Sequence, residues 1–367
     1  MLVNKFADKK NLPMKHLLLS ISFFSSILFP LQAQIIEGTV YDAKTRETIP
    51  GVYIFLDGTS ISTTSDKDGY FKLEVQRINA NLIFRHLSYE SLSVEQPFEL
   101  RQTTFFLKEK AHTLGEAKVV AERQRYSRRQ MMKVFKDQFL GRSTAGVSCK
   151  ILNEDDLVFK YDEAKCQLLA YSNNPLMIEN NHLAYRLTYD LHSFTVQYKI
   201  NSIYDTDIEQ ILISGTSSFA DSKPYNPMFE ARREKIYYRS RQYFWKNFVE
   251  NTLKVNGFKI FNDSKEIELH PYFTITDIED AYIVQVNVKS NLRKSHHRLP
   301  GKAVGIIFVD YSNKYASEVI FMTDEFSVDK FGNTNVVGLF YTGDMETQRI
   351  GDALPLDYLP VAPSSVK

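Results

Sequence analysis

The sequence predicts a mainly β protein: a seven-stranded β-sandwich near the N-terminus, a basic connector, and an α+β domain with an antiparallel meander and one long helix. Three observations lead to this prediction. Short segments of alternating apolar and polar residues recur at regular spacing over residues 35–107. Residues 227–255 contain no Gly or Pro after the first residue and carry an aromatic stripe at helical spacing. Residues 258–341 return to the alternation that is typical of strands.

The first 33 residues are expected to be a signal peptide and are set aside. Four Lys precede an uncharged apolar run at 17–31, and Ala33 supplies a small residue at the cleavage position. The run is shorter than the roughly 20 residues that span a bilayer, so cleavage is favoured over a membrane anchor. No Cys lies near the cleavage site, which excludes a lipoprotein anchor, and no later stretch resembles a membrane span. We therefore expect an exported protein, located in the periplasm or at the outer membrane.

Residues 34–110 are expected to form the sandwich. Gly58 and Gly69 occupy turn positions where a tight hairpin requires a positive φ, which Gly adopts without steric cost. Strands are expected at 36–41, 52–56, 60–64, 70–75, 81–84, 92–95 and 103–107.

Residues 111–145 are expected to be a connector with a short strand and a basic helix. Apolar side chains at Met132, Phe135 and Phe139 recur at helical spacing. The basic face gives candidate contacts for an anionic lipid or lipopolysaccharide, although a docked linker helix with a solvated face is favoured. These candidates are Arg123, Arg125, Arg128 and Arg129.

Residues 146–367 are expected to be one α+β domain of unknown function. Its helix covers 227–255, and Gly257 suits the end of that helix. The tail at 354–360 is expected to be extended and packed on the surface. Strands are expected at 150–152, 157–161, 167–170 and 185–199, and then at 258–261, 272–275, 281–288, 304–311, 316–322 and 336–341.

The charge balance excludes one broad class of function. The chain has 45 Lys and Arg against 44 Asp and Glu, a formal charge of +1. Removing the first 33 residues takes away four Lys and one Asp, which changes the charge to −2. A nucleic-acid binder needs a basic surface for most of its affinity, so no nucleic-acid partner is expected.

The first domain resembles the carboxypeptidase regulatory-like domain, a transthyretin-like sandwich common in exported proteins of Bacteroidota. The resemblance rests on Gly38-Thr39-Val40-x-Asp42-Ala43, on Ile49-Pro50-Gly51-Val52-x-Ile54-x-Leu56-x-Gly58-Thr59, and on Thr64-x-Asp66-x-Asp68-Gly69-x-Phe71-x-Leu73. Residues 114–121 look like the short strand that follows this domain in transporters fed by the TonB system. The resemblance implies a binding or spacer module.

The second region is similar to a part of uncharacterised Bacteroidota envelope proteins. The similarity rests on Phe139-x-Gly141, Cys149-x-Ile151-Leu152-Asn153, Phe159-x-Tyr161-Asp162 and Gln348-Arg349-Ile350-x-Asp352-x-Leu354-Pro355-x-Asp357-Tyr358. It implies no particular activity.

Motifs for catalysis, cofactors and metals are missing from the sequence. A metallocarboxypeptidase needs His-x-x-Glu and a distant His around one zinc, and none of the eight His has Glu three residues later. No nucleophile elbow, dinucleotide fingerprint or phosphate loop is present. We therefore expect no catalytic residue, no cofactor and no metal site.

Two further groups of residues leave alternatives open. Cys149 and Cys166 flank an expected hairpin, so they form either a disulfide or two buried free thiols. A second basic group, expected in a hairpin loop, could meet a carboxylate or phosphate partner, and metal ligation there is disfavoured by the neighbouring cations. It consists of Arg293, Lys294, His296, His297 and Arg298.

The sequence favours a non-catalytic exported protein that binds or assembles at the periplasm or outer membrane. An envelope protein or a surface glycan is the expected partner. The alternative is a hydrolase of glycans or peptides whose site forms only in three dimensions. Its candidate acids are Glu266, Glu268, Asp277 and Glu279, two of which would have to lie about 5–10 Å apart in a cleft.

Overall fold

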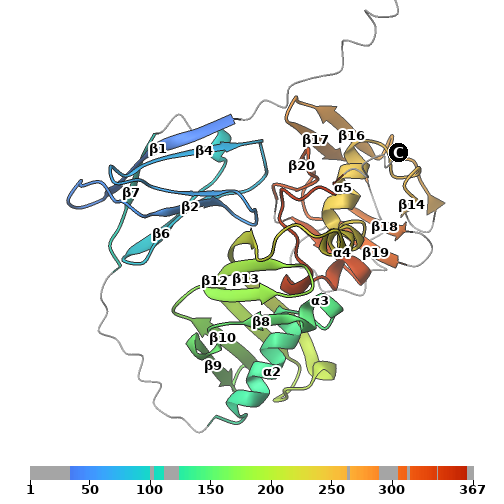
Figure 1. Ribbon diagram of the computed structural model, residues 1–367. Helices are drawn as coiled ribbons and strands as arrows, with labels where there is room; N and C mark the ends of the chain where they lie inside the picture. Colours follow the sequence, from blue (N-terminus) through green and yellow to red (C-terminus); the bar gives the residue numbers. More distant parts are fainter. Residues whose placement is uncertain are drawn as a thin grey trace, which may run out of the picture.

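The computed structural model describes residues 34–99, 103–110, 124–262, 265–288, 305–311, 315–336 and 338–361. The expected signal peptide at 1–33 lies outside these residues. The chain forms three bodies, which follow the sequence from the blue sandwich through a green middle body to a yellow-to-red C-terminal body (Figure 1). No helix within the described residues is long and apolar enough to cross a bilayer.

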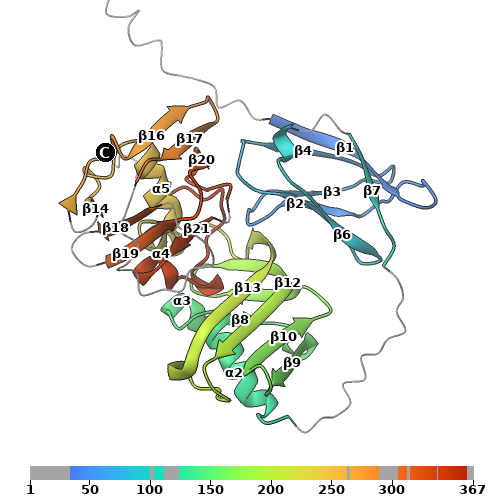
Figure 2. The same ribbon diagram turned by 180° about the vertical axis from the view of Figure 1, so that it is seen from behind.

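The first body is the predicted seven-stranded sandwich. One sheet has the order β4-β1-β7 and the other β3-β2-β5-β6, and Figure 2 shows the two from behind. Gly58 and Gly69 have φ of 75° and 73°, as their turn positions predict. The strands are β1 (Gln34–Asp42), β2 (Tyr53–Leu56), β3 (Ser62–Thr64), β4 (Tyr70–Val75), β5 (Leu82–His86), β6 (Tyr89–Val94) and β7 (Thr104–Leu107).

Alternation along the strands builds the core of the sandwich. In β4 every second residue is buried, which turns Phe71, Leu73 and Val75 toward the opposite sheet. Phe84 and Phe105 meet there with ring centroids 4.6 Å apart. Burial of these apolar side chains is the main force that holds the two sheets together.

The middle body is a six-stranded sheet covered by a helix. Residues predicted to be a connector helix form α2 (Arg128–Phe139), which begins at a capping box between Ser127 and Gln130. Phe135 and Phe139 are fully buried in the core of the sheet, so this helix is docked. The other elements are α3 (Thr144–Val147), β8 (Cys149–Ile151), β9 (Leu157–Asp162), β10 (Gln167–Ser172), β11 (Leu176–Asn180), β12 (Tyr185–Tyr198) and β13 (Ile208–Asp221).

The prediction of one long helix over 227–255 is wrong. The segment forms α4 (Pro227–Tyr237) and α5 (Arg241–Val249), which are separated by a short break. The Ser240 hydroxyl accepts a hydrogen bond from the Tyr243 N–H and starts a new helix there. Ile236 of α4 packs against the middle core, whereas Phe244 and Phe248 of α5 belong to the C-terminal core. The break lets one segment serve two cores.

The C-terminal body contains the predicted antiparallel meander, folded into two sheets around α5. The sheets have the orders β15-β14-β18-β19-β21 and β16-β17-β20. Trp245, at 1% exposure, lies at the centre of the core. Residues 146–367, expected as one domain, therefore contribute to two separate cores. The strands are β14 (Phe258–Asn262), β15 (Lys265–Glu266), β16 (Phe273–Asp277), β17 (Ala281–Val286), β18 (Gly305–Tyr311), β19 (Tyr315–Phe321), β20 (Glu325–Asp329) and β21 (Leu339–Tyr341).

Candidate functional site

The three bodies meet at the hairpin loop 57–60 of the sandwich. The Gly58 N–H donates to the carbonyl of Ser217 in β13 at 2.7 Å, and its own carbonyl accepts the N–H of Leu356 at 2.8 Å. The Phe219 N–H donates to the Thr59 carbonyl at 2.9 Å. A Cβ on Gly58 would lie 2.9 Å from the Leu356 side chain, so the loop fits closely against the C-terminal segment. One turn of the sandwich is thus held by both other bodies.

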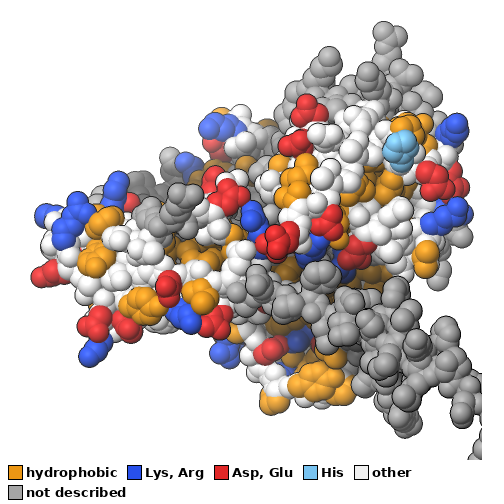
Figure 3. All heavy atoms as spheres, turned by 90° about the horizontal axis from the view of Figure 1, so that it is seen from above, with side chains coloured by type: hydrophobic (Ala, Val, Ile, Leu, Met, Phe, Trp, Pro, Cys, Tyr) orange, Lys and Arg blue, Asp and Glu red, His pale blue; other side chains and the backbone are white. Residues whose placement is uncertain are grey.

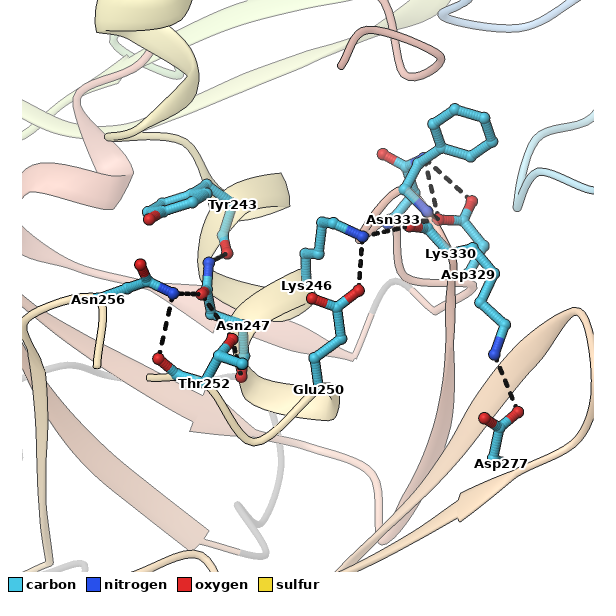
Figure 4. Close-up of polar contacts among 11 residues, drawn as sticks. Tyr243, Lys246, Asn247, Glu250, Thr252, Asn256, Asp277, Asp329, Lys330 and Asn333 are labelled. Carbon is cyan, nitrogen blue, oxygen red and sulfur yellow. Dashed lines mark hydrogen bonds and ion pairs between the residues drawn. The ribbon is translucent and has the colours of Figure 1, made fainter. Parts of the chain in front are cut away.

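A buried carboxylate holds the sandwich to the C-terminal body at a second point. Asp329 is 1% exposed, and its oxygens accept the backbone N–H groups of Asn79, Phe331 and Asn333 at 2.8–2.9 Å. The Asn333 amide, drawn in Figure 4, donates to the same carboxylate at 3.0 Å. Burial raises the pKa of Asp329, and the hydrogen bonds from Asn79 and Asn333 oppose that shift.

The region around Asp329 is tied to α5 by a chain of polar contacts. Lys246 donates to the carbonyl of Lys330 at 3.0 Å and pairs with Glu250 at 2.6 Å. The ammonium group of Lys330 in turn pairs with Asp277 at 2.9 Å. Figure 4 shows these contacts between α5, the turn after β20 and the end of β16. The turn after β20 is therefore fixed from both sides.

The C-terminal segment 349–358 crosses all three bodies. The Gly351 N–H donates to the Leu140 carbonyl at 3.0 Å, and the Asn180 amide donates to the Gly351 carbonyl at 2.9 Å. Farther on, the Tyr358 hydroxyl donates to Glu230 of α4 at 2.6 Å. The tail expected to pack on the surface is instead a strap, and Tyr358 within it is only 8% exposed.

A cleft of about 530 Å³ opens between the middle and C-terminal bodies. It lies where α3, the break between α4 and α5, and the facing ends of β18 and β19 come together. We call it the arginine–tyrosine cleft. Its lining includes four cations, one His, two carboxylates and three Tyr: Arg142, Arg232, Lys235, Arg239, His182, Asp344, Asp352, Tyr238, Tyr311 and Tyr315.

Part of the positive charge in the cleft is not neutralised. Arg142 pairs with Asp137 at 2.8 Å and also with Asp205, both outside the lining. Arg239 lies 3.8 Å from Asp344 and stacks on the Tyr315 ring at 4.0 Å. Within the described part of the chain, Arg232 and Lys235 have no carboxylate partner in an ion pair. The cleft therefore keeps an excess of positive charge.

His182 adds a neutral polar group to the same cleft. Burial lowers its pKa below the ordinary value, and the charge of Arg232 lowers it further. Its imidazole is accordingly uncharged at neutral pH and offers one donor and one acceptor.

The structure places the predicted basic residues of the connector on or beside α2. Arg125 pairs with Glu163 at 2.9 Å. Arg128 donates to the carbonyls of Leu157 and Glu154, and Arg129 is exposed. Figure 3 views the other end of the molecule, over the sandwich and the C-terminal body, and there Lys and Arg are interspersed with Asp and Glu. The remaining predicted residues of the two basic groups, Arg123, Arg293, Lys294, His296, His297 and Arg298, lie outside the described residues.

The disulfide that the spacing suggested does not form, because Cys149 and Cys166 are free thiols. The hairpin expected between them does not exist. Cys149 aligns through Asn180 with Tyr185, and Cys166 lies beside Tyr198, at the other end of β12. That separation is about 40 Å along the strand at roughly 3.3 Å per residue, far beyond the reach of a disulfide.

The four acids considered for a hydrolase are exposed, and the two that lie in strands, Glu266 and Asp277, belong to different sheets. Glu266 is in β15, and Glu268 lies 3.5 Å from Lys254. Asp277 ends β16 and accepts the N–H of Glu279 at 3.2 Å. In the searched, described residues, no group of three or more His, Cys, Asp or Glu is arranged to hold a metal ion.

Sequence reasoning missed the residues that join the bodies and line the cleft. Asp329 and Asn79 are 250 positions apart, so no local pattern connects them. Gly and Asn are residue types that favour turns, and in the Gly332-Asn333 pair Gly332 has a φ of 97°. A Cβ there would lie 2.1 Å from the Gln242 carbonyl oxygen, which requires Gly.

Comparison with known proteins identifies the first body. Over 87 residues the chain is 31% identical to "TonB-dependent receptor P3" of Formosa agariphila, an alignment that covers 24% of this chain and 9% of the receptor. The chain thus matches a small share of that relative. A 9R-lipoxygenase from Cyanothece PCC8801 aligns over 64% of this chain and 49% of its own, with 9% identity and a TM-score of 0.17, too low to bear on the fold. The family model for the CarboxypepD_reg-like domain matches residues 36–120, so the sandwich of this chain belongs to that domain family.

Proposed function

We propose that the chain is an exported, non-catalytic protein of the cell envelope that acts by binding or assembly. The CarboxypepD_reg-like domain and the similarity to a protein named a TonB-dependent receptor support the envelope location. The segment at 1–33, with its basic start and apolar run, supports export.

The observation that carries the proposal is the junction between the three bodies. A spacer domain needs only one covalent link, whereas this sandwich is bonded through the loop 57–60 and through Asn79 to both other bodies. Such a junction holds the bodies in one arrangement, so a partner meets a preorganised surface. Preorganisation lowers the entropy cost of binding.

The arrangement of acids supports a non-catalytic role. Asp277 is paired with Lys330, and Glu266 lies in a different sheet from Asp277. A glycosidase requires two carboxyl groups on either side of one bond.

Crosslinking in cells, followed by purification and mass spectrometry of the attached proteins, tests this proposal. We expect a reproducible envelope partner with the natural chain and a weaker yield with Gly58→Leu, which pushes the sandwich away from Leu356. Lys160→Ala, a change on the exposed face of β9, is the control and should keep the partner. Turnover of peptide or glycan substrates by the purified chain would refute the non-catalytic part.

A further inference from the structure

We propose that the arginine–tyrosine cleft binds a short acidic oligosaccharide, with its sugar rings against the tyrosines and its anionic groups on Arg232 and Lys235. This inference deepens the proposed binding role and rests on it. The cavity of about 530 Å³ lies within the range of 300–1,000 Å³ that is common for small-molecule sites.

The charges of the cleft select an anion. Arg232 is held in place because it donates to the His182 carbonyl at 3.1 Å, and its guanidinium group has further N–H donors to offer. Lys235, one residue before Ile236, is exposed at the cleft and has no ion pair among the described side chains. A carboxylate or sulfate placed between them would form charge-assisted hydrogen bonds, the stronger class of such bonds.

The aromatic side chains favour a sugar as the carrier of that anion. Tyr238 is 40% exposed, and its ring contacts Tyr243 with centroids 5.1 Å apart, so it lines the cleft in a fixed orientation. Tyr311 stacks on Phe258 at 4.4 Å, and this fixes the orientation of its ring and hydroxyl group. Rigid Tyr rings with an apolar face and a hydroxyl edge suit ligands that have both apolar and polar sides, as sugar rings do.

The groups around His182 complete the set of polar contacts. Ser143 donates to Asp352 at 2.6 Å at the same wall of the cleft, which leaves the second carboxylate oxygen as an acceptor for a sugar hydroxyl. The neutral imidazole of His182 can bond another hydroxyl. A peptide segment offers one backbone N–H donor per residue to these acceptors, whereas a sugar ring presents several O–H groups.

Isothermal titration calorimetry of the purified chain with three matched ligands tests the inference. Trigalacturonate carries three carboxylates on sugar rings, and maltotriose has three uncharged rings. Triglutamate, blocked as the N-acetyl amide, has three carboxylates without the rings. We expect trigalacturonate to bind at least about tenfold more tightly than maltotriose, since a charge-assisted contact contributes roughly that factor. It should also bind more tightly than triglutamate, which has no sugar rings to pack against the tyrosines. Raised ionic strength should weaken its binding.

Variants locate the binding at this cleft. Lys235→Glu reverses an exposed charge with no partner to lose, and we expect about tenfold weaker binding of trigalacturonate. Arg232→Gln keeps a donor for the His182 carbonyl and should also weaken it, and Tyr238→Ser should reduce it about fivefold. Lys160→Glu makes the same charge change on β9, far from the lining residues, and should bind as the natural chain does.

Each other outcome overturns the inference. Absence of trigalacturonate binding at millimolar concentration refutes an acidic-sugar site, and equal affinity for triglutamate identifies an acidic peptide as the ligand instead. Equal affinities of Lys235→Glu and Lys160→Glu refute the location. These results leave the crosslinking test of envelope assembly unaffected, and the lack of a crosslinked partner leaves the calorimetry unaffected, so the two failures are distinguishable.

Discussion

Replacing Asp329 by Ala tests whether the buried carboxylate holds the sandwich to the C-terminal body. The substitution removes the acceptor of three backbone N–H groups and of one side-chain amide. A buried donor left without a partner costs about 1–3 kcal/mol, and a water molecule entering the vacated space would recover part of that. We therefore expect Asp329→Ala to lower the free energy of unfolding by about 3–5 kcal/mol, a large value for one substitution.

Urea unfolding followed by tryptophan fluorescence measures this loss. The chain has a single Trp, and Trp245 is buried in the core to which Phe326 and Val328 of β20 also belong. Hydrogen exchange at the Asn79 amide gives a second readout, because that N–H should lose protection when its acceptor is removed.

Asp324 provides the matched control, since it is an exposed Asp five residues earlier in the same region. Asp324→Ala should change the free energy of unfolding by less than about 0.5 kcal/mol. If Asp329→Ala stays within about 1 kcal/mol of the natural chain, or if Asn79 keeps its protection, the carboxylate does not join the two bodies.

Three further predictions concern the junction, the thiols and one ion-paired acid. Gly58→Ala should destabilise the chain by about 1–3 kcal/mol in the same urea assay, because φ is positive there, and adding Leu356→Ala should recover only the part due to the clash. A thiol reagent should label Cys166 before Cys149, since burial raises the pKa of Cys149 to about 12, and equal rates would contradict this. The pKa of Asp137 is lowered because two basic side chains outweigh its partial burial, so its contribution is present above about pH 4 and lost as the pH falls through the lowered pKa. Urea titrations of the natural chain and Asp137→Asn should therefore differ near pH 6 and converge in strong acid, and a difference that persists there would contradict the assignment.

The sandwich was predictable because the signals for its strands and turns lie within short stretches of the sequence. Strand β4 alternates strictly between exposed and buried residues. Gly69 marks the turn before it, and Gly58 marks the turn between β2 and β3. Alternation and turn chemistry act over two to six residues, so they can be read directly from the sequence.

The prediction of one helix over 227–255 was wrong for a physical reason that the sequence shows only in part. Good helix formers and an aromatic stripe continue through the break, and only Ser240 signals a new start. The segment is divided because it packs against two cores: Ile236 against the core of the middle body, and Phe244 in the core of the C-terminal body. Tertiary packing of this kind overrides helix propensity.

Strand β13 shows the same limit for a sheet. It pairs with β12 along its length and has an isolated bridge from Ser218 to Thr59, and most of its residues are exposed or half-buried. An edge strand with weak apolar contrast resembles a polar loop in sequence. Yet its residue Ser217 accepts the hydrogen bond from Gly58, so part of the junction depends on a strand that the sequence did not predict.

The motif at residues 348–358, named in the sequence analysis, is explained by the structural contacts of its residues. Gly351 lies so close to Gly146 that a Cβ would be 2.3 Å from its Cα, and this contact permits no other residue without a shift of the backbone. Asp357 accepts the Ser60 N–H at 2.8 Å, and Tyr358 bonds Glu230. These contacts give the residues of the motif a structural role: Gly351 and Tyr358 hold the segment to the middle body and to α4, and Asp357 holds it to the sandwich. The same segment also forms one side of the arginine–tyrosine cleft, through Asp352. Residues 349–358 therefore both hold the bodies together and form part of the cleft. A substitution such as Gly351→Ala should weaken both the stability of the fold and the binding of trigalacturonate.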